Sequence, residues 1–269
     1  MEINNPYLAI INDKNKYNPN IFKGMKFEKI DVKMGDWFKK TGLIERETLE
    51  ALNNAILKLR SVSATCTVNS AGRTQFDQVY AKVEKFAGVL KNTKSIKQAI
   101  NKTRAEVARI GYSEHLSNLA VDLRIDTQNM VVPPRIKQKY PNVTNINTLK
   151  FLTKRLIMEQ SGFILRYPIS PRLKEVTGVA NPEGWHWRYV GAEHSQKIAK
   201  IREYVTNTLN IRDENNDLIT QEVFLEDYIK ILQQGFKADS EHDLLQQYAD
   251  YFIKNILCYS EQFEVNQSL

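Results

Sequence analysis

The sequence predicts an α+β fold in which helices flank a small antiparallel sheet and a C-terminal helical extension follows. Segments with helical and strand-like hydrophobic spacing interleave over residues 45–208 without a regular strand–helix–strand repeat, which argues against a parallel sheet. After residue 209 only helical patterns remain. We therefore expect one main domain over residues 1–208 and a helical extension over 209–269.

The first half of the main domain is predicted to hold a strand between helices. Apolar residues recur every three or four positions over 45–59, as in an amphipathic helix. β-Branched and small polar residues alternate over 61–68, as in a strand, and a turn follows at 70–73. Segment 92–110 is polar and basic, which indicates a helix and a loop. Helical spacing also occurs over 74–90, where one face carries Phe76, Val79, Tyr80, Val83 and Phe86 or Ala87.

The second half is predicted to supply the remaining strands and the last helices. Strands are expected over 119–125, 163–167 and 185–190. Prolines at 133, 134 and 141 indicate a loop. Helices are expected over 147–159, capped by Asn147, over 192–208, and in the extension over 222–233 and 241–257, after a polar connection at 212–217.

Composition narrows the class of partner. With 42% hydrophobic and 26% charged residues, the 269-residue chain is typical of a soluble globular protein, and no apolar run is long enough to span a membrane. The net charge of +7 favours an anionic partner such as anionic lipid or a cell wall. Because Lys and Arg are scattered among Asp and Glu, we do not expect nucleic-acid binding.

Neither the first residues of the chain nor its cysteines suggest an exported, cross-linked protein. Residues 1–6 lack the basic segment and apolar core of a secretory signal, so the site of action stays open between the cell interior, another export route and a leader outside this sequence. The two cysteines, Cys66 and Cys258, are far apart, and nothing in the sequence indicates a bridge. We expect Cys66 to be a buried free thiol.

Two short stretches offer the side chains of a catalytic metal site. Ser113–Asp122 contains His115 and Asp122, and Glu183–Gly191 contains His186. Two imidazoles and one carboxylate leave a fourth position open for water, and Glu183 provides a spare carboxylate as base. The spacing of His115 and Asp122 fits a loop or bulge leading into a strand. A histidine beside two tryptophans is also typical of a packed core, so each half alone is a weak signal.

Taken together, these residues resemble the zinc D-alanyl-D-alanine carboxypeptidases of the vancomycin-resistance type, with the related LD-carboxypeptidases and DD-dipeptidases. The family pattern reads S-x-H-x6-D, then E-x-W-H, usually followed by R-Y-V-G. It matches Ser113 to Asp122 and Glu183 to Gly191. Further similar segments, which extend the resemblance over about residues 5 to 200, are 5–12, Ser70–Thr74 with Gln78, 162–168 and Thr177–Gly178.

The resemblance implies a Hedgehog/DD-peptidase-like fold, a Zn²⁺ cofactor and peptidoglycan stem peptides as partners. It implies that His115, Asp122 and His186 bind the metal, and that Glu183 is the general base and later the proton donor. Arg73 would stabilise the oxyanion or bind the substrate carboxylate. It places Gln78, Ser113 and Trp185 in substrate binding. Without the resemblance, Arg73 also fits a solvated turn residue and Ser113 a capping hydroxyl.

The chain also departs from the family where the substrate pocket is shaped. Asn118 stands where Gly is usual, and we expect it to keep a left-handed turn because Asn tolerates that conformation. Gly184 replaces the usual Pro, and Ala71–Gly72 replace Gly–Tyr. No ligand is lost, so these changes affect substrate preference and not the metal. His194 and His242 are expected to be surface residues and not ligands.

The implied function is removal of the terminal D-amino acid, D-Ala, from stem peptides by metal-activated water. Two other functions stay open. A phage-type peptidoglycan endopeptidase would use the same zinc site on a different bond. A non-catalytic zinc-containing binding module would need neither Glu183 nor Arg73, because a fold by itself does not fix function.

Overall fold

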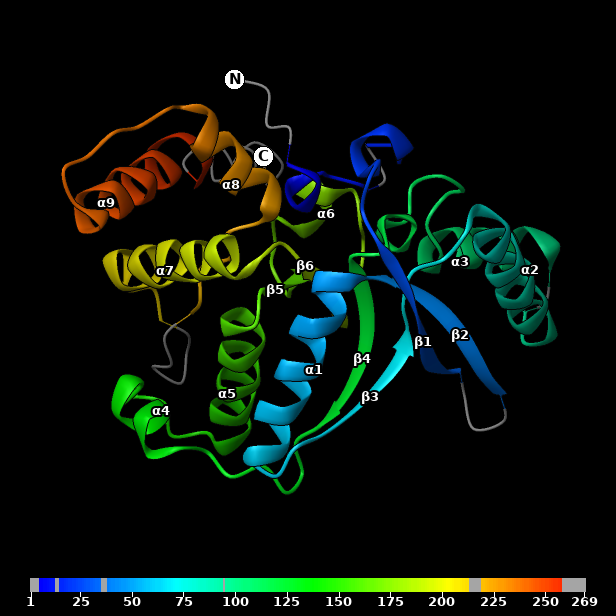
Figure 1. The fold of residues 1–269 in the computed structure, drawn as a ribbon, viewed down its shortest axis with the longest axis horizontal. Helices are drawn as coiled ribbons and strands as arrows, with labels where there is room; N and C mark the ends of the chain where they lie inside the picture. The colour runs from blue at the N-terminus through cyan, green and yellow to red at the C-terminus, as the bar shows by residue number, and fades with distance from the viewer. Residues whose placement is uncertain (1–4, 13–14, 35–37, 94, 213–218, 258–269) are drawn as a thin grey trace.

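A four-stranded antiparallel sheet forms the centre of the computed structural model, with the strand order β3-β4-β6-β5. The structure describes residues 5–12, 15–34, 38–93, 95–212 and 219–257 (Figure 1). The strands are β3 (Thr65–Ser70), β4 (Ala120–Asp126), β5 (Phe163–Tyr167) and β6 (Glu183–Tyr189). A second sheet pairs β1 (Phe27–Met34) with β2 (Phe38–Glu45). Small antiparallel sheets among helices confirm the predicted α+β class.

Two helices cover one face of the central sheet, and this leaves the other face for polar side chains. Helices α1 (Arg46–Ser61) and α5 (Ile146–Gln160) lie side by side next to the strands in Figure 1. They share a hydrophobic cluster with alternate residues of the sheet, including Leu123 of β4 and Trp187 of β6. Because side chains alternate along a strand, Asp122 and His186 project from the opposite face.

Side-chain caps fix where the helices begin. Glu45 caps α1 by accepting from the backbone N–H groups of Glu47 and Thr48. Thr74 and Asp77 form a capping box at the start of α2 (Gln75–Lys91). Asn145 caps α5, so the predicted cap Asn147 is two residues too late. The shorter helical elements are 3-10 turns Pro6–Leu8, Pro19–Phe22 and Glu114–Ser117 and helices α3 (Ile96–Glu106), α4 (Pro134–Lys139) and α6 (Leu173–Thr177).

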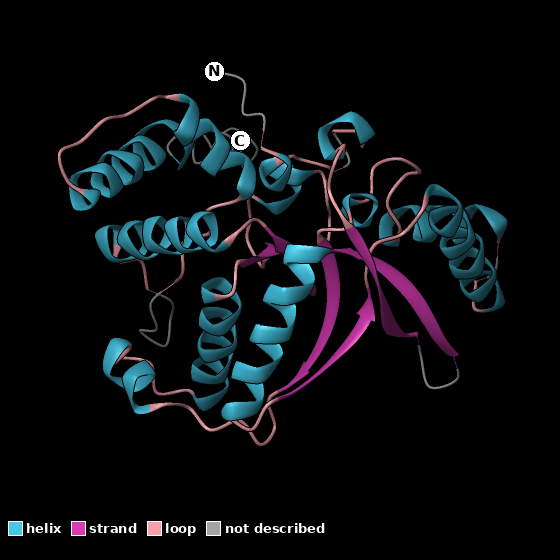
Figure 2. Cartoon of the chain, viewed as in Figure 1, coloured by secondary structure: helices cyan, strands magenta, loops and turns pink. Residues whose placement is uncertain are grey.

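The last three helices form a group that packs against the central sheet. Helices α7 (Ala192–Leu209), α8 (Leu225–Gln233) and α9 (Glu241–Phe252), with a π-turn at Ile253–Leu257, group on the side opposite α2 and α3 (Figure 2). They share a second hydrophobic cluster with Ile164 and Val190. Ion pairs tie the same region to the main domain: Arg155–Glu222, Arg166–Glu226 and Arg172–Asp227. The predicted domain boundary between residues 208 and 209 remains a prediction.

Several predicted elements need correction. Helix α1 continues through Ser61, because the Ser61 hydroxyl donates to the Lys58 carbonyl and the Val62 N–H donates to the carbonyls of Leu59 and Arg60. The strand predicted over 61–68 therefore runs over Thr65–Ser70. Helix α8 begins at Leu225 and not at 222. The loop predicted around the prolines contains α4, whose Pro134 occupies the first turn, where proline is tolerated.

One hairpin was not predicted, and some predicted features lie outside the residues that the structure describes. The β1–β2 hairpin was not predicted, and the polar connection at 212–217 lies largely outside the described residues, as does Cys258. Cys66 is a free, partly buried thiol that packs against the main core. None of the described helices has the length and apolar character of a membrane-spanning segment.

Gly162 should be required for the connection between α5 and β5. Its φ is +95°, and a Cβ there would lie 2.4 Å from Cε2 of the buried Tyr189. We expect Gly162→Ala to lower the free energy of unfolding by about 1–3 kcal/mol. Gly88→Ala in α2 is the control, because its Cβ meets nothing within 4 Å, and it should raise stability by about 0.5–1 kcal/mol. Urea denaturation measures both, and equal shifts would show that the connection does not need glycine at 162.

Candidate metal site

Three polar side chains converge on the free face of the sheet. In the register of β4 and β6, Asp122 lies directly opposite His186. His115 approaches from the 3-10 turn Glu114–Ser117, which leads into β4. Asn118 ends that turn at φ +59°, so the expected left-handed conformation is confirmed. One ligand atom from each of His115, Asp122 and His186 lies within 4.8 Å of the others.

The distances suit a tetrahedral cation. Nε2 of His115 lies 3.2 Å from Oδ2 of Asp122, and Nδ1 of His186 lies 2.9 Å from Oδ1 of the same carboxylate. Two ligands at about 2.0–2.1 Å from zinc at tetrahedral corners are about 3.3 Å apart. Each histidine lies near this spacing from one oxygen of the Asp122 carboxylate, and the three ligand atoms all lie within 4.8 Å of one another.

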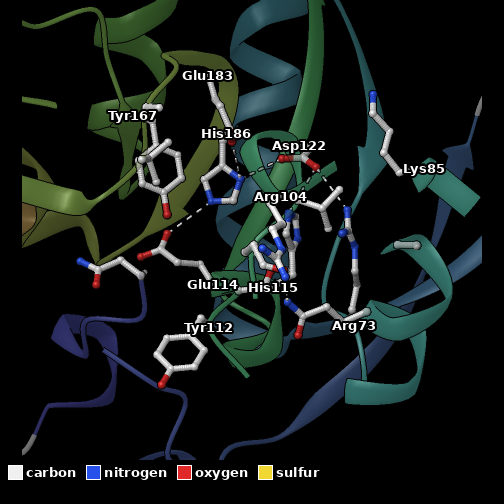
Figure 3. Close-up of a pocket in the computed structure, with 18 of the residues that line it drawn as sticks. Arg73, Lys85, Arg104, Tyr112, Glu114, His115, Asp122, Tyr167, Glu183 and His186 are labelled. Carbon is white, nitrogen blue, oxygen red and sulfur yellow. Dashed lines mark hydrogen bonds and ion pairs between the residues drawn. The ribbon is translucent and has the colours of Figure 1, made fainter. Parts of the chain in front are cut away.

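Hydrogen bonds on the far side of each ring turn a lone pair toward the centre of the site. Nδ1 of His115 lies 2.8 Å from the carbonyl oxygen of Ala71. A carbonyl only accepts, so Nδ1 carries the proton and Nε2 is free to bind metal. Nε2 of His186 lies 3.3 Å from the carboxylate of Glu114, which likewise leaves Nδ1 for the metal (Figure 3). Such outer partners fix tautomer and ring orientation in metal sites.

The charges around the ligands favour a cation. Burial alone would raise the pKa of Glu114, but the Arg166 guanidinium and the bond to His186 outweigh it and lower that pKa to about 2. Burial lowers the pKa of His186, yet its bonds to Asp122 and Glu114 outweigh this and raise the pKa to about 10. Burial lowers the pKa of His115. A metal ion in this position takes over the positive charge that the protonated His186 carries.

A buried ion network supports the site from behind. Nε of Arg166 donates to Glu114 at 2.8 Å, and its two terminal nitrogens donate to Glu226 of α8 at 2.9 and 2.5 Å. Asn12 also donates to Glu226, at 2.7 Å. The side chains of Arg166 and Glu114 are fully buried. The orientation of His186 is thus linked through Glu114 and Arg166 to the C-terminal helices.

The remaining predicted residues lie around one cavity of about 760 Å³ that contains the ligands. Glu183 lines it, with its carboxylate 3.8 Å from Nδ1 of His186. Burial, followed by the charges of Asp122 and Glu114, raises the pKa of Glu183. Arg73 lines the cavity too, bonded to Ser70 and with a terminal nitrogen 3.6 Å from Asp122.

The three residues predicted to bind substrate differ in how they face this cavity. Ser113 is buried in its wall, and its side chain makes no capping bond to the following turn. Trp185 is 51% exposed at the lining, as a substrate-covering residue can be. Gln78 also lines the cavity, but its amide bonds the backbone of Ala108, Arg109 and Gly111. Its side chain therefore holds that loop in place.

Several lining or supporting residues were not predicted. Tyr167 stacks on His186 with ring centroids 5.0 Å apart, and Glu114 and Arg166 form the network described above. All three lie within segments that resemble the family, so these motifs could have identified them. Glu226 had no local signal. From α2 and α3, the cavity also receives Lys85, Lys102 and Arg104.

The two other histidines lie outside the ligand group. Nδ1 of His194 lies 3.0 Å from the Tyr228 hydroxyl, so His194 is partly buried and not a simple surface residue. The ring of His242 lies 6.4 Å from that of Tyr204. Within the described part of the chain, neither histidine joins a cluster with metal-ligand spacing.

The family model of the D-alanyl-D-alanine carboxypeptidase VanY matches residues 43–192, more than half of the chain. The chain belongs to this family. Its members are metal-dependent peptidases. The matched VanY region contains Arg73, Glu183 and all three candidate ligands.

Two curated relatives of this VanY-family chain come from enterococci. A bifunctional D-Ala-D-Ala dipeptidase and carboxypeptidase, VanXYC of Enterococcus gallinarum, is 36% identical over 101 residues, which are 36% of this chain and 45% of the relative. A D-alanyl-D-alanine carboxypeptidase of Enterococcus faecalis is 35% identical over 134 residues, 49% of this chain and 42% of the relative. The chain therefore spans less than half the length of these relatives.

A solved structure agrees with the fold. The VanY D,D-pentapeptidase E175A mutant from a VanB-type resistance cassette, in complex with Zn(II), superposes with a TM-score of 0.56. The identity is 24%, and the match covers 83% of this chain and 99% of the other. The VanY fold thus extends over most of the described residues, and zinc fits the donor set of this chain.

Glu226 should tune metal affinity although it lies on α8. Glu226→Gln removes one of two carboxylates that hold Arg166, which should loosen Glu114 and then His186. We expect zinc affinity to fall about 10-fold or more, as is usual for outer-layer partners of metal ligands. Competition with a chromophoric chelator measures the Kd. Glu241→Gln, which breaks an exposed pair with Lys200, is the control and should leave the Kd unchanged.

Proposed function

We propose that this chain is a zinc-dependent carboxypeptidase that hydrolyses the terminal D-amino acid, D-alanine, of peptidoglycan stem peptides. The observation that carries the proposal is a spare carboxylate, Glu183, beside three convergent metal ligands in one cavity. Membership of the VanY family and the activities named for its enterococcal relatives support the substrate class.

The metal accounts for one part of this chemistry. Zinc held by His115, Asp122 and His186 would lower the pKa of a water molecule to about 7 and would polarise a carbonyl group. With the metal bound, His115 and His186 would both be neutral ligands, because Ala71 and Glu114 hold their other ring nitrogens. Asp122 completes the set as an anion, since the nearby imidazoles lower its pKa despite burial.

Glu183 performs the proton transfers. Its carboxylate takes a proton from the attacking water as the new C–O bond forms at the last peptide carbonyl. The same proton then passes to the nitrogen of the departing D-alanine as the C–N bond breaks. Because burial raises the pKa of Glu183, its carboxylate is a stronger base than an exposed glutamate and a competent acid in the second step.

Arg73 supplies a positive charge beside the substrate. Its guanidinium faces the cavity beside Asp122 and is held at its base by the Ser70 hydroxyl. From there it donates to the carbonyl oxygen that becomes negative, or to the terminal carboxylate of the peptide. A module that only binds peptidoglycan has no use for a base beside its metal, so Glu183 supports the enzymatic alternative.

Removing the base should separate metal binding from catalysis. We expect Glu183→Ala to retain zinc, because Glu183 is not among the three ligands, and to lower kcat by about 10²–10⁴-fold. Elemental analysis measures the zinc, and release of D-alanine measures kcat. His186→Ala is the matched comparison and should lose the zinc itself. Full activity in Glu183→Ala would exclude the proposed mechanism.

Defined stem peptides test the substrate. The protein is incubated with tripeptide, tetrapeptide and pentapeptide stems, with and without a chelator, and the products are identified by mass spectrometry. Loss of one D-alanine from the pentapeptide, abolished by chelation, is the expected result. Cleavage between L-Ala and D-Glu would instead identify an endopeptidase, and zinc content without cleavage of any stem would identify a binding module.

A further inference from the structure

Helix α2 turns its apolar stripe toward solvent. Phe76 is 78% exposed, Tyr80 57% and Val83 60%, and Val79 and Leu90 extend the same face at helical spacing. The periodicity that predicts this helix would normally mark a face buried in a core. Monomeric proteins rarely expose a contiguous apolar surface of this kind without an interaction that uses it.

The opposite face of α2 explains the orientation. Gln78, Ala81, Lys85, Gly88 and Asn92 line the cavity that contains the metal ligands. These positions lie about half a turn away from the apolar stripe at 100° per residue. Because the polar face closes the wall of the cavity, the apolar stripe can only face outward. In Figure 1, α2 and α3 project together from the side of the sheet, away from the C-terminal helices.

The same arm carries most of the net charge of the protein. Residues 75–109 include eight Lys or Arg and three Asp or Glu, a balance of +5, whereas the whole chain has +7. By helical geometry, Lys82 lies at one border of the apolar stripe, and Lys91 lies at the other border next to Glu84 and Asp77. Helix α3 adds Ile96, which is 63% exposed, beside Lys97. Lys85, Lys102 and Arg104 face the cavity instead, so the basic side chains that share the outer surface with the apolar stripe include Lys82, Lys91 and Lys97.

We propose that this arm, α2 and α3, docks on the surface of an anionic lipid bilayer. Helices with an exposed apolar face and basic borders lie in the interface, where the apolar side chains enter the acyl boundary and Lys meets headgroup phosphates. A second copy of the chain is a poorer occupant, because two arms of net positive charge repel each other. A soluble polyanion would satisfy the charge but would leave Phe76, Tyr80 and Val83 in water.

Docking in this orientation leaves the site accessible. The stripe that enters the interface faces away from the cavity wall, so the cavity stays open to solvent while the arm is bound. The inference goes beyond the proposed peptidase activity and does not depend on it, because vesicle binding needs neither the metal nor Glu183.

Vesicle sedimentation tests the proposal. The 269-residue protein is mixed with phosphatidylglycerol vesicles or with phosphatidylcholine vesicles, and the bound fraction is measured at low and at physiological salt. We expect binding to the anionic vesicles, at least tenfold weaker binding to the neutral ones, and partial loss of binding as salt rises.

Two exposed positions give a matched pair of variants. Val83→Asp places a charge in the stripe, whereas Leu57→Asp places the same charge on α1 at nearly the same exposure, 61% against 60%. Val83→Asp should weaken vesicle binding at least tenfold, and Leu57→Asp should change it less than twofold. Phe76→Ser removes apolar surface without adding charge and should weaken binding as well.

Other outcomes would overturn the proposal. These are absence of binding to anionic vesicles, equal binding to neutral vesicles, or equal effects of Val83→Asp and Leu57→Asp. Sedimentation velocity that shows a concentration-dependent dimer, broken by Val83→Asp, would assign the stripe to a second copy instead. Circular dichroism of each variant establishes that a loss of binding is not a loss of folding.

Discussion

The metal site and the C-terminal helices both depend on one buried guanidinium, that of Arg166. Arg166 has no exposed side-chain surface, and it is neutralised by Glu114 on one side and Glu226 on the other. A buried charge is tolerated only when its partners are in place, and removal of one partner from such a pair typically costs about 3–5 kcal/mol. The same contacts that neutralise Arg166 also fix the ring of His186 and anchor α8. The ion pairs that stabilise the C-terminal helices therefore also determine the geometry of the metal site.

The geometry of the central sheet positions two of the three metal ligands. Antiparallel pairing sets Asp122 against His186, and alternation gives α1 and α5 the apolar face while the polar face remains for ligands. The third ligand enters on a tight turn that needs a left-handed residue, and Asn118 provides it. The close approach of Gly72 to Asn118 shows how little room this arrangement leaves for another side chain.

The parts that the sequence could predict are those with a local signature. The α+β class and helix α1 followed from hydrophobic periodicity, and the three-ligand group followed from the resemblance of two short motifs to the family pattern. The β1–β2 hairpin was missed although Ile30, Val32 and Met34 alternate with charged residues, because a strand rich in lysine has little β-propensity. Glu226 could not be predicted, since its partner lies 60 residues away and no pattern links them. The apolar periodicity of α2 predicted the helix correctly. It did not predict that the apolar face is exposed and the opposite face lines the cavity, because periodicity does not show which face of a helix is buried.

The ion pair between Arg166 and Glu226 also makes the metal site depend on a segment that follows it in the chain. All three candidate ligands precede residue 187, whereas Glu226 lies on α8. A chain that lacked α8 would therefore keep every ligand and yet leave Arg166 with one carboxylate in place of two. The metal site and its charge balance are thus encoded in separate parts of the chain, so a substitution far from the family motif can disturb the site.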